Sequence, residues 1–213
     1  MAWLPRRPAG SSALLHSVRE GVAGAGLLLG SLGVGWATVR WLPGERGVVG
    51  GALGLGLALA GWMRIGVARD FRRGGIGERS VGRRLAGLER RGWLVAHDVR
   101  KPGGCNVDHL LASPQGRVYT VETKLNRFAA PQLAQARAHA EWAEEFLGAP
   151  ATPVLCVANG RARPRVYAGV WCLGANRVTA FLVNLDASLE PVFELLLAGH
   201  GRAGPAAARV RCG

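Results

Sequence analysis

Lysine and acidic residues are both scarce in this chain of 213 residues. Only Lys101 and Lys124 are lysines among the 27 basic residues, so arginine supplies nearly all of the positive charge. With 14 acidic residues, the formal net charge is +13. Such an excess suits binding to a polyanion, to a cytoplasmic membrane surface, or to both. Because the arginine bias accounts for part of it, the charge alone does not choose between these partners.

Cysteine is also rare, and aromatic residues do not cluster along the chain. The four cysteines show no CxxC pairing and no regular spacing, which makes them poor candidates for a zinc site or a disulfide framework. No aromatic-rich stretch forms a stacking platform for bases, so the sequence gives no support for base-sequence readout. What the chain does contain is two long apolar runs, followed by a small group of acidic residues around Lys124.

The two apolar runs, residues 21–39 and 47–63, carry no charge and consist mainly of Gly, Ala, Leu and Val. Each is close to the roughly 20 residues that a helix needs to cross a bilayer, so we predict two transmembrane helices. A signal peptide explains the first run less well, because a second run follows and no clear small-x-small cleavage site is present. Soluble core helices are the alternative, although so much glycine makes poor soluble helices.

Arginine flanks the outer ends of this predicted hairpin more densely than its loop. By the positive-inside rule both termini face the cytoplasm, which predicts a two-pass protein of the inner (cytoplasmic) membrane. Glycines four residues apart would let the helices approach closely, unless the spacing merely reflects a glycine-rich chain. The arginines are Arg6, Arg7 and Arg19 before the first run, Arg40 and Arg46 in the loop, and Arg64, Arg69, Arg72 and Arg73 after the second. The glycine pairs are Gly26 and Gly30, Gly47 and Gly51, and Gly50 and Gly54.

The composition changes after residue 63 and divides the chain. The expected parts are a cytoplasmic segment at 1–20, the transmembrane hairpin at 21–63, a basic linker at 64–76, an α/β domain at 77–199 and a disordered basic tail at 200–213. Within the linker and the start of the domain, Gly74-Gly75-Ile76-Gly77 is predicted to be a flexible lead-in.

Periodicity predicts the elements of the α/β domain. One helix is predicted at 78–91, ended by Gly92, and another at 131–147, with Pro131 at its start and Gly148 at its end. A last helix is predicted at 187–198. The predicted strands are 93–99, 106–112, 117–124, 153–158, 165–171 and 177–183. This order predicts an α/β sandwich around a mixed sheet.

Two of these strands carry acidic residues and one of the two lysines. Asp108 lies on the strand 106–112, Glu122 and Lys124 lie on 117–124, and the turn Ser113-Pro114-Gln115-Gly116 joins the strands. Residues i and i+2 of a strand share a face, so Glu122 and Lys124 point the same way. Two carboxylates beside an ammonium form a metal site suited to phosphodiester hydrolysis. The alternative is a solvated lysine on a strand surface.

Short motifs follow one another through this part of the chain. They are Gly77-Glu78, His97-Asp98-Val99, Gly104-Cys105-Asn106-Val107-Asp108-His109, Val121-Glu122-Thr123-Lys124, Gln135-Ala136-Arg137 and Thr152-Pro153-Val154-Leu155-Cys156-Val157. In order and spacing they resemble the nuclease-related domain, often called NERD, a presumed branch of the PD-(D/E)XK nuclease superfamily. The resemblance covers residues 74–159. The helix motif departs from the family in one respect, since Pro131 precedes Gln135 by four residues where the family usually has three.

The resemblance implies an αβββαβ core with a divalent-metal site at the centre of the sheet. Asp108 and Glu122 would be metal ligands, and Glu78, which taken alone is equally a helix-dipole partner, would complete or orient the site. Lys124 would position the attacking water or stabilise charge on the phosphoryl oxygens, and Gln135 would support the site from the second helix. The implied cofactor is Mg²⁺ or Mn²⁺, because Mg²⁺ prefers one or two carboxylates plus water.

These features together predict a membrane-anchored, metal-dependent nuclease, with DNA as the expected partner. A catalytically inactive, membrane-tethered nucleic-acid-binding or scaffold module of the same fold is the alternative. A role at the membrane, with the positive charge serving only anionic lipids, is a third. Arginines on and near the helices would contact phosphates, unless they form only a solvated face. These are Arg83, Arg84, Arg127 and Arg137, with Arg90 and Arg91. His109 alternates to the opposite strand face from Asp108 and is predicted to be structural.

Overall fold

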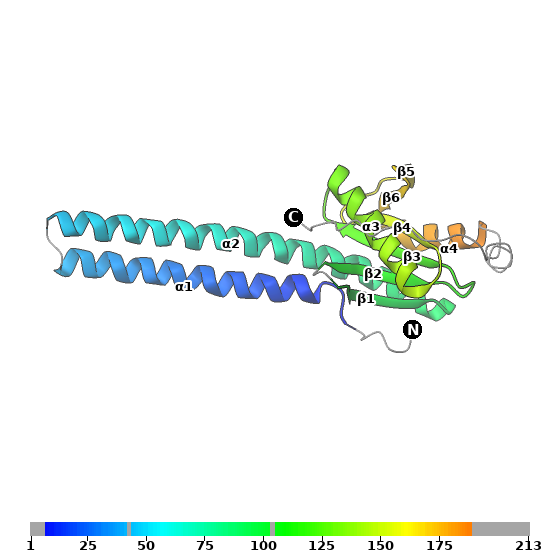
Figure 1. Ribbon diagram of the computed structural model, residues 1–213, viewed down its shortest axis with the longest axis horizontal. Coiled ribbons are helices and arrows are strands. Elements are labelled where there is room, and N and C mark those ends of the chain that lie inside the picture. The colour runs from blue at the N-terminus through cyan, green and yellow to red at the C-terminus, as the bar shows by residue number, and fades with distance from the viewer. Residues whose placement is uncertain (1–6, 42–43, 103–104, 189–213) are drawn as a thin grey trace. The chain divides into compact units, whose positions relative to one another are not determined.

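The chain folds into two units (Figure 1). The computed structural model describes residues 7–41, 44–102 and 105–188. A helical unit comprises residues 11–75, and an α/β unit comprises the described residues on either side of it, 7–10 and 76–188.

The helical unit contains the two predicted apolar helices. They are α1, Ser11–Trp41, and the first part of α2, Glu45–Ala86. Both are long and apolar enough to cross a membrane, by length and composition. Only 6% and 11% of their most apolar windows are buried, whereas the core helix of a soluble protein is mostly buried. Large side chains such as Leu29 and Val48 are exposed instead.

The two helices touch through glycine. A Cβ atom added to Gly61 would lie 2.8 Å from the carbonyl oxygen of Gly24, and one added to Gly24 would lie 2.9 Å from that of Gly61. Close backbone approach of this kind is what small residues permit between membrane helices. Of the predicted pairs, Gly50 and Gly54 do face α1. The prediction is wrong for Gly26, Gly30 and Gly51. A Cβ atom added to any of these three would meet no atom within 4 Å, because they point away from the opposite helix.

We expect Gly61→Val to destabilise the helical unit, because the new side chain must displace the backbone of α1. Overpacking of this kind costs about 1–3 kcal/mol. Gly30→Val is the matched control, since its added side chain meets open space. Thermal melting of the full chain in a zwitterionic detergent, followed by far-ultraviolet circular dichroism, measures both. Equal melting of the two variants would contradict the glycine contact.

Helix α2 continues through the segment in which the sequence predicted a linker and a flexible lead-in. Residues 64–76 are all helical, including Gly74 and Gly75 of the predicted lead-in. Helix propagation is cooperative, and each glycine costs only about 1 kcal/mol relative to alanine. The expectation of a flexible lead-in is therefore wrong: Gly77 is buried against Ala158 and Leu125 of the same α/β unit, where a larger residue would crowd both.

The α/β unit is built on a mixed sheet of six strands in the order β1-β2-β3-β4-β6-β5. The first three strands pair antiparallel, β4 and β6 continue parallel to β3, and β5 closes the edge antiparallel to β6. Their bounds are β1 Leu94–Arg100, β2 Asn106–Ala112, β3 Val118–Lys124, β4 Ala151–Val157, β5 Arg165–Tyr167 and β6 Val170–Gly174. The predicted α/β class and mixed sheet are confirmed.

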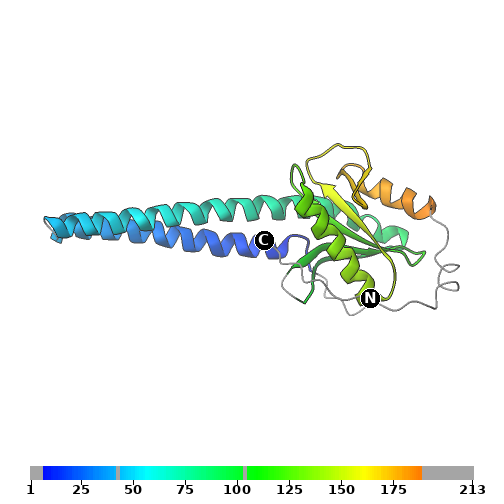
Figure 2. The same cartoon turned by 45° about the horizontal axis from the view of Figure 1, so that its top comes forward.

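Helices cover both faces of this sheet (Figure 2). One face packs against the end of α2 and against α4, Val178–Ser188, through a cluster that includes Leu85, Tyr119 and Leu182. The other face packs against α3, Ala130–Leu147, around Leu110 and Leu155. After α2, a short 3-10 turn, Glu89–Arg91, ends at Gly92 with φ 80°. Alternation along β3 therefore sends Tyr119 toward α2 and α4, and Glu122 toward α3.

Two predicted strands differ from the structure. The stretch 165–171 forms β5 and the start of β6, separated by a turn at Ala168 and Gly169 with positive φ. The stretch 177–183 is not a strand but the start of α4. Its β-branched and aromatic residues suggested a strand, yet Val178, Leu182 and Asp186 recur every four residues and bury one helical face. The predicted helix at 187–198, beyond its first two residues, and the predicted tail at 200–213 lie outside the described residues.

Candidate active site

Strands β2 and β3 separate where the predicted site begins. Their pairing runs from Ala112–Val118 to His109–Val121. The next residue along β2 is Asp108, whose Oδ2 accepts a hydrogen bond from the backbone N–H of Thr123 at 2.7 Å. A side chain takes the place of a backbone acceptor here, so the Asp108 carboxylate is held at the opening between the strands.

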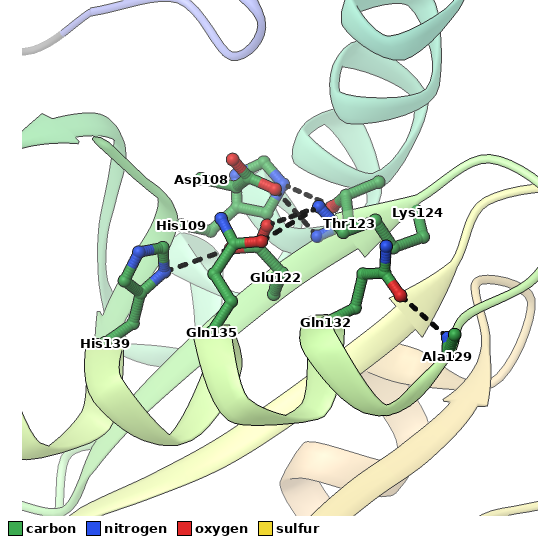
Figure 3. Close-up of polar contacts among 9 residues, drawn as sticks. All are labelled: Asp108, His109, Glu122, Thr123, Lys124, Ala129, Gln132, Gln135 and His139. Carbon is green, nitrogen blue, oxygen red and sulfur yellow. Dashed lines mark hydrogen bonds and ion pairs between the residues drawn. The ribbon is translucent and has the colours of Figure 1, made fainter. Parts of the chain in front are cut away.

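Glu122, Lys124 and Gln135 meet beside this opening (Figure 3). The Nζ of Lys124 donates to Oε1 of Glu122 at 2.8 Å and to Oε1 of Gln135 at 3.4 Å. Glu122 is only 3% exposed, whereas Lys124 and Gln135 are partly exposed. Lys124 is therefore not the solvated surface lysine of the alternative interpretation, because its ammonium is fixed against a buried carboxylate.

The start of α3 sets the position of Gln135. Pro131 lies in the first turn, and Oε1 of Gln132 accepts a hydrogen bond from the backbone N–H of Ala129 at 2.7 Å. Both features are common at helix starts, since they use or replace backbone N–H groups that have no partner within the helix. One turn after Gln135, the same face of α3 presents His139.

His139 is a site residue that sequence reasoning missed. Its Nδ1 lies 3.0 Å from Oε2 of Glu122, and both side chains are almost fully buried. The contact lacks full hydrogen-bond geometry, and among the described residues Nε2 of His139 has no hydrogen-bond partner. The only sequence signal was the spacing of four residues from Gln135, which places both residues on one helical face.

Glu78 and Asp108 complete a group of acidic side chains around Glu122. Burial, followed by the charges of Glu122 and Asp98, raises the pKa of Glu78 to about 7. Burial, followed by the charges of Glu122 and Glu78, raises the pKa of Asp108 well above its ordinary value, although the Thr123 N–H and Lys124 oppose this. These mutual effects place the carboxylates of Glu78, Asp108 and Glu122 near one another.

Glu122 and Lys124 form a charged pair within this group. Burial raises the pKa of Glu122, but His139 and Lys124 together lower it below its ordinary value. Burial lowers the pKa of Lys124, but Glu122 raises it above its ordinary value. At neutral pH the ammonium is therefore protonated and cannot act as a base, and it balances only one of the neighbouring carboxylates.

The donor set suits a hard cation with few protein ligands. Within the described ranges, no three His, Cys, Asp or Glu side chains form a ready-made metal cage. Mg²⁺ does not require one, since it usually keeps several waters and binds one or two carboxylates. Asp108 and Glu122 supply such oxygens, and Oε2 of Glu122 is a buried acceptor without a hydrogen bond. The residues present therefore fit Mg²⁺ or Mn²⁺.

A second polar group lies behind the site on β1 and β2. The two Nδ1 atoms of His97 and His109 are 2.9 Å apart, and Nε2 of His109 lies 3.2 Å from Oγ1 of Thr123. His109 is fully buried, which agrees with its predicted structural role. Asp98 has φ 51°, and its Oδ1 accepts a hydrogen bond from Nδ2 of Asn106 at 2.6 Å. These contacts fix β1 and β2 beside the site.

The predicted phosphate-binding arginines are exposed but are spread over the unit. Arg83 and Arg84 lie on α2, Arg137 lies on α3, and Arg127 follows β3. Because α2 and α3 cover opposite faces of the sheet, these four residues do not form one patch. Their contact with nucleic acid stays a prediction.

Comparison with known proteins agrees with the resemblance seen in the sequence. Residues 73–159 match the family model NERD, described as the nuclease-related domain. No curated protein and no solved structure matches the chain. The matched stretch begins in α2 shortly before Glu78 and ends just after β4, so it contains all the acidic residues described above together with Lys124, Gln135 and His139. Residues 73–159 of the chain are therefore similar to the nuclease-related domain.

Proposed function

We propose that this chain is a membrane-anchored, metal-dependent nuclease that hydrolyses phosphodiester bonds in DNA, with a core of the PD-(D/E)XK type. The observation that carries the proposal is the 2.8 Å contact between Lys124 and Glu122 beside Asp108 and Glu78. It unites several acids, which suit a divalent cation, with a single ammonium, which suits a phosphoryl oxygen. An inactive scaffold has no need for buried, mutually repelling carboxylates.

The side chains then take separate roles. Asp108 and Glu122 hold the cation, and Glu78 completes or orients its binding. When bound, Mg²⁺ or Mn²⁺ supplies charge that polarises the phosphate and lowers the pKa of water. Lys124 stabilises negative charge on the phosphoryl oxygens or positions the attacking water, because a protonated ammonium is a preorganised donor. Gln135 restrains Lys124 through its Oε1.

The apolar helices provide the proposed anchor. Their exposed apolar side chains suit the interior of a lipid bilayer, and the arginines beyond both ends favour a cytoplasmic location for the α/β unit at the inner membrane. A nuclease placed there meets cytoplasmic DNA that approaches the membrane.

The experiment uses the full chain in zwitterionic nanodiscs with fluorescently labelled plasmid and linear DNA. Cleavage that requires Mg²⁺ or Mn²⁺ and stops with a chelator supports the proposal. DNA binding with no cleavage of any DNA or RNA form tested would support the inactive scaffold. Salt-sensitive binding to anionic vesicles without nucleic-acid affinity would support the lipid-binding alternative.

We expect His139→Leu to weaken Mn²⁺ binding about 10- to 100-fold, as do other changes to groups that orient metal ligands. The reason is that Oε2 of Glu122 loses the ring beside it. His139→Gln keeps a polar group at the position and is expected to recover part of the affinity. Titration calorimetry with Mn²⁺ measures both variants. Wild-type affinity in His139→Leu would show that the histidine only fills space.

A further inference from the structure

The fold brings together two aromatic rings that lie far apart in the chain. Phe128 follows β3, and Tyr167 ends the edge strand β5; their ring centroids are 5.8 Å apart. Phe128 packs partly on the core cluster under α3, whereas Tyr167 is 43% exposed. Two arginines flank the rings, and both are exposed: Arg127 precedes Phe128, and Arg165 lies two residues before Tyr167.

The register of the sheet places this group on the same face as the site. Glu122 pairs with Leu155, Leu155 pairs with Cys172, and Cys172 pairs with Arg165. Paired residues point to one face, so Arg165 lies on the face of Glu122 that α3 covers. Tyr167 shares this face, because it is two residues from Arg165 on the same strand.

The distance between the two groups is also set by the sheet. Three strand spacings separate β3 from β5, which corresponds to about 14 Å. Phe128 lies between them in this direction, since it packs on the cluster that contains Leu155 and Cys172. In this direction Phe128 lies nearer to the Glu122–Lys124 pair than Tyr167 does, and the residues of the row between them, Leu155 and Cys172, are buried under α3.

The charge around the rings distinguishes them from a second aromatic pair. Trp142 and Phe146 on α3 stack with centroids 4.9 Å apart. Their exposed neighbours along the helix are acidic: Glu141, Glu144 and Glu145. A polyanion is repelled there, whereas the arginines beside Phe128 and Tyr167 attract it. Alternating rings and cations are the usual means of binding a single nucleic-acid strand without sequence preference.

We propose that Phe128, Tyr167, Arg127 and Arg165, here called the aromatic–arginine surface, bind a single strand of DNA that leads to the site. The rings stack on exposed bases, and the guanidinium groups contact phosphates. A duplex does not offer base faces, so this surface selects single strands, frayed ends or flaps. The inference rests on the proposed nuclease function and names its substrate. It also lies partly outside the matched nuclease-related domain, since β5 follows residue 159.

The test measures binding in the absence of metal, so that it is independent of cleavage. The full chain in zwitterionic nanodiscs with a chelator is titrated into fluorescein-labelled oligothymidylate of about 12 nucleotides, a length within the usual site size, and into a duplex of equal length. Fluorescence anisotropy gives both dissociation constants. We expect the single strand to bind more tightly than the duplex.

Three variants and one control locate the binding. Tyr167→Ala and Phe128→Leu, which keeps the apolar contact with the core, should each weaken single-strand binding roughly tenfold and leave duplex binding nearly unchanged. Arg165→Gln should lower the slope of log affinity against log salt by about one unit or slightly less. Phe146→Leu is the matched control and should bind as wild type.

Several results would overturn the inference. Wild-type binding in both ring variants would show that the rings only pack. Equal losses for single strand and duplex would assign the affinity to general charge. If binding follows the expected pattern but no metal supports cleavage, the surface stands and the nuclease proposal fails. If metal supports cleavage but single strands bind no more tightly than duplexes, the nuclease proposal stands and the surface fails.

Discussion

Replacing Glu122 with glutamine is expected to reduce metal-dependent DNA cleavage by about three orders of magnitude. A bound cation supplies several kcal/mol of transition-state stabilisation, and each 1.36 kcal/mol is worth a factor of about ten. Glutamine keeps the shape of the side chain, so the contacts with Lys124 and His139 retain polar partners. Initial rates on a labelled DNA substrate with Mg²⁺ provide the measurement.

Glu141→Gln is the matched control. Glu141 lies exposed on α3, so this substitution removes one negative charge, as Glu122→Gln does, but away from the site. A second measurement separates chemistry from folding. Mn²⁺ should raise the melting temperature of the wild type and of Glu141→Gln, but not of Glu122→Gln, since only a protein that binds the ion in its folded state is stabilised. Activity of Glu122→Gln within about tenfold of the control would remove Glu122 from the metal site.

Removing Asp186 is expected to lower the free energy of unfolding of the α/β unit by about 3–5 kcal/mol. The carboxylate of Asp186 on α4 lies 3.6 Å from Nη1 of Arg117 and accepts a hydrogen bond from the hydroxyl of Tyr119 at 3.0 Å. All three side chains lie on the face of the sheet that α2 and α4 cover, and Arg117 and Asp186 are almost fully buried. Asp186→Ala removes the carboxylate beside the buried guanidinium and the acceptor of the Tyr119 hydroxyl.

Thermal melting of the full chain in detergent, followed by near-ultraviolet circular dichroism, measures this loss, and Asn184→Ala on the exposed face of α4 is the control. A surface change of that kind stays within about 0.5 kcal/mol. The double variant Arg117→Met with Asp186→Leu should recover much of the stability, because two apolar side chains replace the ion pair without leaving a charge. No recovery in the double variant would point to lost packing of α4 instead.

Most of the sheet could be predicted from alternation and turn residues. The strand predicted at 106–112 has the observed bounds of β2, and the helix predicted at 131–147 differs from α3 by one residue. Here the local sequence pattern favours the same element that the tertiary structure contains, as is usual in sequences that fold to one structure. The stretch 177–183 shows the opposite case, because its strand-like composition yields to a helix that buries Val178 and Leu182.

The meeting of Glu122 and Lys124 could be expected from their spacing on one strand, whereas two other features of the site could not. His139 is one histidine on an alanine-rich helix, and its approach to Glu122 depends on where α3 crosses the sheet. The position of Asp108 depends on where the pairing of β2 and β3 ends, and no residue type in the sequence predicts that point. Their chemical roles, like those of Glu78 and Gln135, stay predictions.

The buried hydrogen bond between Tyr119 of β3 and Asp186 of α4 has a consequence for protein production. A fragment cut at residue 159 would keep every residue of the family match but lose β6 and α4, leaving β4 as a bare parallel edge. Val154 and Cys156, which pack beside Leu173 and Leu182, would be uncovered as well. Unprotected edges of this kind template aggregation. Soluble expression of the α/β unit should therefore include residues through at least Ser188, where α4 ends.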